Sequence, residues 1–83
     1  MKIYETPKFQ RLRKKIRSEV EKQALKGAIA VIAATPLAGK KLKGELQDYR
    51  SLAYTAAGQE RRLIYQVRET ELYLLAFGPR EGS

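Results

Sequence analysis

The sequence predicts a small α+β domain in which an N-terminal strand and a two-helix hairpin pack on a small antiparallel sheet, in the order β-α-α-β-β-β. Apolar residues recur at helical spacing in the first half of the chain, and runs rich in β-forming residues fill the second half. Proline and glycine mark the boundaries between these segments. At 83 residues, we expect a single domain over residues 1–83, with a net stability of only a few kcal/mol.

Charge and residue usage narrow the function. The chain carries 17 Lys and Arg against 9 Asp and Glu, and residues 1–26 hold nine of the basic residues and three of the acidic ones. This balance favours a polyanionic partner, a nucleic acid or an acidic protein segment, although a solvated basic surface explains it equally well. Cysteine and histidine are absent, so we expect no metal or other cofactor. No apolar run approaches the roughly 20 residues that span a bilayer, so we expect a cytoplasmic protein without a membrane partner.

The first helix is predicted to follow a short edge strand within residues 1–6. Thr6 is suited to the N-cap and Pro7 to the first helical position. From Pro7 to about Arg17 the apolar residues form one stripe, and lysines and arginines occupy the rest of the surface. The stripe consists of Phe9, Leu12 and Ile16.

A second helix is predicted to begin after a tight connection. Ser18 and Glu21 have the capping-box spacing, and Thr35 is the last residue before a proline, where a helix usually ends. The broad apolar face of this segment suits a helix that lies across a sheet. Gly27 within it is either a weak point or a close-packing contact, and we favour the contact.

Residues 36–48 have the composition of a loop, with three lysines between Gly39 and Gly44. A phosphate cradle and a solvated loop are both open interpretations. The segment does not match a Walker A loop, because the preceding strand, the spacing and the following Ser or Thr are absent.

Three strands are predicted over residues 49–56, 58–68 and 72–77. In the middle strand Leu63, Tyr65 and Val67 alternate with Arg62, Ile64 and Gln66, so Arg62 lies on the side away from the helices if the apolar set faces them. Antiparallel pairing places Arg80, which follows the last strand, beside Arg61 and Arg62. An arginine cluster at this place predicts an anion-binding surface.

Four short segments, taken in order, carry a resemblance to a known family. They are Lys41–Gly44, Tyr49–Leu52, Ala57–Tyr65 and Ala76–Glu81. On these residues the chain resembles the RelE/ParE superfamily of toxins from type II toxin–antitoxin systems. The resemblance implies a helical hairpin on an antiparallel sheet and a cognate antitoxin protein as partner. In RelE-like members it also implies a ribosome-dependent endoribonuclease, whose second partner is mRNA on the ribosome.

The resemblance also implies roles for single residues. RelE-like cleavage uses the 2′-hydroxyl as the nucleophile against the neighbouring phosphate, so cations must stabilise the phosphorane-like transition state and an acid must protonate the leaving 5′-oxygen. Arg62 matches the family arginine at the start of the third strand, and Arg80 matches the one after the last strand. Arg50 matches a supporting catalytic cation. The residues expected to bind RNA are Lys41, Lys43 and Arg61.

Two departures from the RelE pattern keep other functions open. Leu52 stands where RelE has a second basic residue, and Arg80 is not followed by the family's tyrosine. Tyr49, Tyr54 and Tyr65 are candidates for the general acid, with core packing as the alternative for each. The chain could instead be a ParE-like inhibitor of DNA gyrase, or a non-catalytic homologue that binds an antitoxin.

Overall fold

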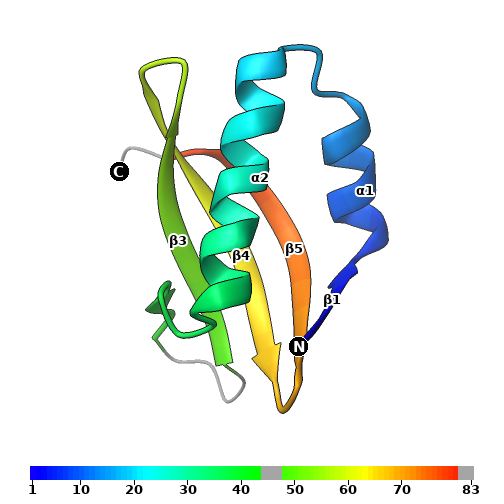
Figure 1. Cartoon of the computed structure of the whole chain (residues 1–83), viewed down its shortest axis with the longest axis vertical. Helices are drawn as coiled ribbons and strands as arrows, with labels where there is room; N and C mark the ends of the chain where they lie inside the picture. The colour runs from blue at the N-terminus through cyan, green and yellow to red at the C-terminus, as the bar shows by residue number, and fades with distance from the viewer. Residues whose placement is uncertain (44–47, 81–83) are drawn as a thin grey trace.

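The computed structural model describes residues 1–43 and 48–80, and there it shows two helices on one face of a five-stranded sheet (Figure 1). The strands are β1 (Lys2–Glu5), β2 (Lys40–Lys41), β3 (Asp48–Ala56), β4 (Gln59–Arg68) and β5 (Glu71–Pro79), and the helices are α1 (Pro7–Lys14) and α2 (Glu19–Ala34). The spatial order of the strands is β1-β5-β4-β3-β2. Neither helix in this described part of the chain is long and apolar enough to cross a membrane.

The predicted α+β order is confirmed, and the sheet adds two details. Strand β1 pairs with β5 in parallel, whereas every other pair is antiparallel, so the sheet is mixed. The segment expected to be a loop contains β2, a strand of two residues that pairs with β3. Part of that predicted loop, residues 44–47, lies outside the described residues.

Both helices begin at the predicted caps. The Thr6 hydroxyl accepts a hydrogen bond from the Phe9 amide at 3.3 Å, and Pro7 takes the first helical position. The Ser18 hydroxyl accepts one from the Glu21 amide, also at 3.3 Å. Helix α1 ends at Lys14, three residues before the predicted end. These caps fix the start of each helix at a polar residue that the sequence identifies.

The hydrophobic core lies between the helices and the sheet. Its fully buried members come from α1, α2, β4 and β5, and they are Phe9, Leu25, Ala28, Ile32, Leu63, Tyr65, Leu72 and Leu74. Leu63 and Tyr65 are 0% exposed, which confirms that this side of β4 faces the helices. Side chains alternate along a strand, so Arg62 and Ile64 lie on the opposite side of the sheet. We call that side, which neither helix covers, the open face (Figure 1).

The close-packing role predicted for Gly27 is wrong. A Cβ atom built at Gly27 would meet nothing within 4 Å, because this part of α2 faces outward. The tightly packed glycine is Gly39, where a Cβ atom would lie 2.6 Å from the phenol oxygen of Tyr65. A glycine that the packing requires therefore lies in the connection from α2 to β2.

Candidate anion-binding site

Arg62 lies on the open face of the sheet between two hollows. It pairs with Ala53 on β3 and with Gly78 on β5, so its lateral neighbours are small and leave its side chain standing above them. The hollow on the β5 side has a volume of about 420 Å³ and is lined also by Ile64 and Ala76. The hollow on the β3 side measures about 140 Å³. Arg62 is the wall that the two hollows share.

The guanidinium of Arg62 forms no hydrogen bond with any other described residue. Its Nε atom is buried, and no acceptor among those residues pairs with it. Within residues 1–43 and 48–80 the side chain forms no ion pair either. A buried donor without a partner costs free energy, about 1–3 kcal/mol. An arginine kept at such a cost, beside open hollows, is suited to bind an anion from outside the chain.

Arg80 lies at the same end of the sheet as Arg62. Arg80 follows Gly78, the pairing partner of Arg62, by two residues. Its amide donates a hydrogen bond to the carbonyl oxygen of Glu60 at 3.2 Å. The topology therefore brings the two arginines to neighbouring strands, as the sequence predicts. The Arg80 side chain is 54% exposed and pairs with the Glu60 carboxylate at 3.1 Å. An ion pair this exposed contributes only about 0–1 kcal/mol, so a phosphate can replace the carboxylate at little cost.

Arg50 is not part of this constellation. It pairs with Tyr65 across β3 and β4, and so lies on the helix side of the sheet. Its Nη1 atom donates to the carbonyl oxygens of Gly39 at 2.9 Å and Leu37 at 3.3 Å. Its Nε atom lies 2.8 Å from the Asp48 carboxylate. These contacts hold the connection between α2 and β2 against the sheet.

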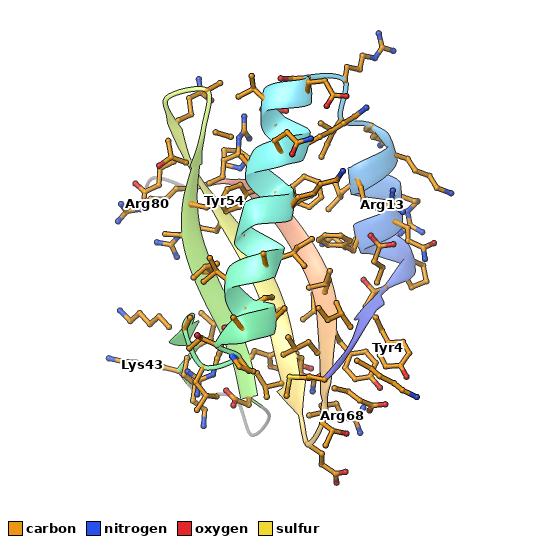
Figure 2. The ribbon with its side chains drawn as sticks, viewed as in Figure 1. Tyr4, Arg13, Lys43, Tyr54, Arg68 and Arg80 are labelled. Carbon is orange, nitrogen blue, oxygen red and sulfur yellow. The ribbon has the colours of Figure 1, made fainter. Side chains whose placement is uncertain are left out.

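Arg61 also lies on the helix side. Its guanidinium forms an ion pair with Glu21 of α2, in which the two side chains are 19% and 30% exposed. Arg61 pairs across the strands with Tyr54, which Figure 2 labels beside α2. Burial raises the pKa of Tyr54, while the Arg61 charge lowers it and that of Glu21 raises it. Neighbours in sequence, Arg61 and Arg62 therefore point to opposite sides of the sheet.

The lysines of residues 40–43 are divided in the same way. Lys40 pairs with Ser51 and lines the smaller hollow, on the open face with Arg62. Lys41 pairs with Arg50, so it lies on the other face. Lys43 extends from the lower end of the β3 edge, whereas Arg80 lies toward the upper end (Figure 2). Sequence reasoning missed Lys40, because a strand of two residues shows no alternation from which a face could be inferred.

The three candidate tyrosines have different environments. The Tyr65 hydroxyl donates to the Pro36 carbonyl oxygen at 2.7 Å and accepts from the Gly39 amide at 2.8 Å, so it is committed to the fold. Burial raises the pKa of Tyr65, and the Gly39 hydrogen bond lowers it. Tyr54 lies under α2. Tyr49 shares the strand face of Ser51 and Ala53, and so is the one of these three on the side of Arg62.

The described residues contain no group of three or more His, Cys, Asp or Glu side chains that could hold a metal ion. The polar groups that line the smaller hollow are a guanidinium, an ammonium and a hydroxyl, from Arg62, Lys40 and Ser51. All three are hydrogen-bond donors, and two are cations. This chemistry suits phosphate or carboxylate oxygens.

Together, the fold and this site define a small basic α+β protein with a free arginine on the uncovered face of its sheet. The family model described as the ParE-like toxin of type II bacterial toxin–antitoxin systems matches residues 3–82. The chain belongs to this family, and hence to the RelE/ParE superfamily of toxins.

Two solved structures share the fold over almost the whole chain. The toxin–antitoxin complex RelBE of E. coli, in its intact form, matches with 23% identity and a TM-score of 0.75, over 98% of this chain and 98% of that chain. The isolated E. coli RelE toxin, in its P21 form, matches with 22% identity and a TM-score of 0.73, over 99% of this chain and 86% of that chain. No curated protein matches the chain.

Proposed function

We propose that this toxin is an endoribonuclease that cuts mRNA on the ribosome. The observation that carries the proposal is the free guanidinium of Arg62 on the open face, with Arg80 at the same end of the sheet. A planar guanidinium offers parallel donors that match two oxygens of one phosphate. The similarity of the fold to the RelE toxin of E. coli supports the same choice.

The proposed reaction needs no cofactor. The 2′-oxygen of one nucleotide attacks the adjacent phosphorus, the bond from phosphorus to the 5′-oxygen breaks, and the proton lost by the 2′-hydroxyl is balanced by one gained at the 5′-oxygen. Arg62 and Arg80 stabilise the negative charge that grows on the phosphate oxygens. Lys43 contacts the RNA backbone at the other end of the β3 edge. Tyr49, on the face of Arg62 but paired with Gln66 four residues farther along β4, contacts the RNA strand away from the scissile phosphate.

The test is cleavage of mRNA bound in the ribosomal A site, mapped by primer extension. Arg62→Ala should lower the cleavage rate by about 10²–10³, the usual effect of removing one donor to a charged transition state. Arg68→Ala is the matched control, because Arg68 ends the same strand on the same face but lines neither hollow. Equal rates for wild type and Arg62→Ala, or no cleavage by wild type, would reject the proposal.

We also propose that a cognate antitoxin binds this chain. The similar E. coli structure is a toxin–antitoxin complex, and it covers 98% of this chain. The first helix has no acidic residue in its first turn and ends in Arg11, Arg13 and Lys14, so its outer surface is strongly basic. An acidic or amphipathic antitoxin segment would suit this surface. Its dissociation constant should then rise with salt, and a salt-independent value would contradict a role for α1.

A second candidate function can be tested with the same purified protein. The matching family is described as ParE-like, and two of the expected cations, Arg50 and Arg61, are engaged by Asp48 and Glu21. Both features are compatible with a toxin that inhibits DNA gyrase without cutting RNA. A supercoiling assay discriminates between the two. Inhibition of supercoiling by a protein that leaves A-site mRNA intact would favour this function over the endoribonuclease.

A further inference from the structure

The smaller hollow beside Arg62 is walled by donors that the fold does not use. Its lining consists of Lys40, Leu42, Ser51, Ala53 and Arg62, with no carboxylate among them. In the described part of the chain, the side chains of Lys40, Ser51 and Arg62 form no hydrogen bond or ion pair. Three free donors around a space without an acid create a positive potential that attracts an anion.

The shape of the hollow follows from the order of the strands. Ser51 and Ala53 on β3 are short and form a low floor, while Lys40 on β2 and Arg62 on β4 rise on either side. Two strand spacings of about 4.8 Å separate β2 from β4, so their backbones lie about 10 Å apart. A volume of about 140 Å³ is small beside the roughly 300 Å³ of ordinary ligand pockets. The space suits one tetrahedral anion better than a nucleobase or a cofactor.

We infer that this hollow is a phosphate-binding site that holds one phosphodiester group of a single-stranded RNA. Lys40 and Arg62 bind the phosphate oxygens from two sides, and the Ser51 hydroxyl, in a residue that is 8% exposed, donates from the floor. Arg62 is common to both hollows, so it contacts this phosphate and the scissile one beyond it. The assignment of the anion to an RNA phosphodiester rests on the proposed function. The binding of an anion in this hollow does not depend on that function.

The position of Lys40 is fixed by the residue before it. The Gly39 amide donates to Tyr65, and the Gly39 carbonyl oxygen accepts from Arg50 at 2.9 Å. Both partners belong to the central strands of the sheet. The ladder between Lys40 and Ser51 then sets the side of the sheet on which the ammonium lies. The backbone of Lys40 is therefore ordered before an anion binds, and the entropy cost of binding falls on its side chain alone.

The experiment measures binding of a short single-stranded RNA whose 2′-hydroxyls are all methylated, so that it cannot be cleaved by 2′-attack. Fluorescence anisotropy across a salt series gives the dissociation constant and its salt slope. Lys40→Met should raise the dissociation constant about tenfold or more and reduce the slope by about 0.7, the contribution of one phosphate on a single strand. Ser51→Ala should weaken binding in the same direction without changing the slope.

Two comparisons make the result decisive. Lys26→Met, on the exposed surface of α2, controls for the general loss of one positive charge. If Lys40→Met binds no more weakly than Lys26→Met, or if Lys41→Met has the larger effect, the inference is overturned. Thermal unfolding of each variant must match wild type within a few degrees, so that a folding defect is not read as lost binding.

A titration with inorganic phosphate, followed by amide chemical shifts, distinguishes the source of the anion. Shifts at Lys40 and Ser51 with both phosphate and the methylated RNA are the expected result. Shifts with inorganic phosphate but not with RNA would overturn the assignment to a phosphodiester. The test is separate from that of the proposed function, because Lys40-dependent RNA binding by a protein that leaves A-site mRNA intact would reject the endoribonuclease and keep this site.

Discussion

The phenol oxygen of Tyr65 and the amide nitrogen of Gly39 lie 2.8 Å apart, and this hydrogen bond joins the connection after α2 to the central strand of the sheet. The same oxygen donates to the Pro36 carbonyl at 2.7 Å. Arg50 secures Gly39 from its other side. The candidate site therefore depends on residues that lie on the opposite face of the sheet, because they determine where β2 runs and thus where Lys40 lies.

Gly39→Ala should destabilise the fold. Its Cβ atom would lie 2.6 Å from the oxygen of Tyr65 and 2.8 Å from Cε1, and Tyr65 is fully buried and cannot move aside. We expect a loss of about 1–3 kcal/mol in the free energy of unfolding, measured by urea denaturation. Gly27→Ala is the control, because its Cβ atom would meet nothing within 4 Å. That variant should gain about 0.5–1 kcal/mol from helix propensity, and a loss there would contradict the argument.

Tyr65→Phe should cost about 1–3 kcal/mol, because the Gly39 amide and the Pro36 carbonyl lose their shared partner in a buried place. The cost should depend on pH. Burial raises the pKa of Tyr65 above its ordinary value of 10.0, so the unfolded chain ionises first. The stability supplied by the neutral phenol is complete below pH 10 and is lost as pH rises through the raised pKa.

The measurement is the difference in unfolding free energy between wild type and Tyr65→Phe from pH 8 to pH 11. The difference should be constant below about pH 10 and shrink above it. Tyr54 and Tyr73 also have raised pKa values, but both remain in the variant and cancel in the comparison. A difference that grows above pH 10 would show that the ionised phenol is stabilised, contrary to the buried environment.

The helices and strands of this fold can largely be predicted from the sequence. The sheet faces on which the residues of β2 and β3 lie cannot. Thr6, Pro7 and Ser18 mark the helix starts because capping is a local interaction. The proximity of Arg62 and Arg80 is also predictable, since antiparallel pairing alone produces it. The parallel partnership of β1 with β5 joins the two ends of the chain, and no local signal reports it.

The candidate site was predicted only in part, for a physical reason. Arg50 and Lys41 are cations in the expected segments, but the register of β2 on β3 places both on the helix side of the sheet. Register is a property of the paired strands, and a shift of one residue exchanges the faces. Lys40 and Lys41 are adjacent residues of the same type, so composition does not distinguish them. The alternation of β3, which has residues of both kinds on each face, gave no basis for choosing between them.

Thr6→Ala should cost more stability than Ser18→Ala, although both hydroxyls cap a helix. Ser18 makes one bond, to the Glu21 amide, at an exposed position. Thr6 accepts from the Phe9 amide and also donates to the Leu74 carbonyl oxygen at 2.9 Å, which links α1 to β5. We expect about 0.5–1 kcal/mol for Ser18→Ala and about 1–2 kcal/mol for Thr6→Ala, by urea denaturation. Equal losses would mean that the bond to β5 contributes nothing.

Substitutions of Arg61 and Arg62 should have different effects on the free energy of unfolding. Arg61 forms a partly buried ion pair with Glu21, so Arg61→Met and Glu21→Met should each cost about 1–3 kcal/mol by leaving the other charge without its partner. The double variant should lose less than the sum, because two apolar side chains then share the space between α2 and β4. Arg62→Met, which breaks no hydrogen bond or ion pair within the described residues and removes the buried Nε donor, should not lower stability and should raise it by up to about 1–3 kcal/mol. Urea denaturation of the four variants gives the coupling energy, and additive losses at positions 21 and 61 would show that the ion pair does not join the helix to the sheet.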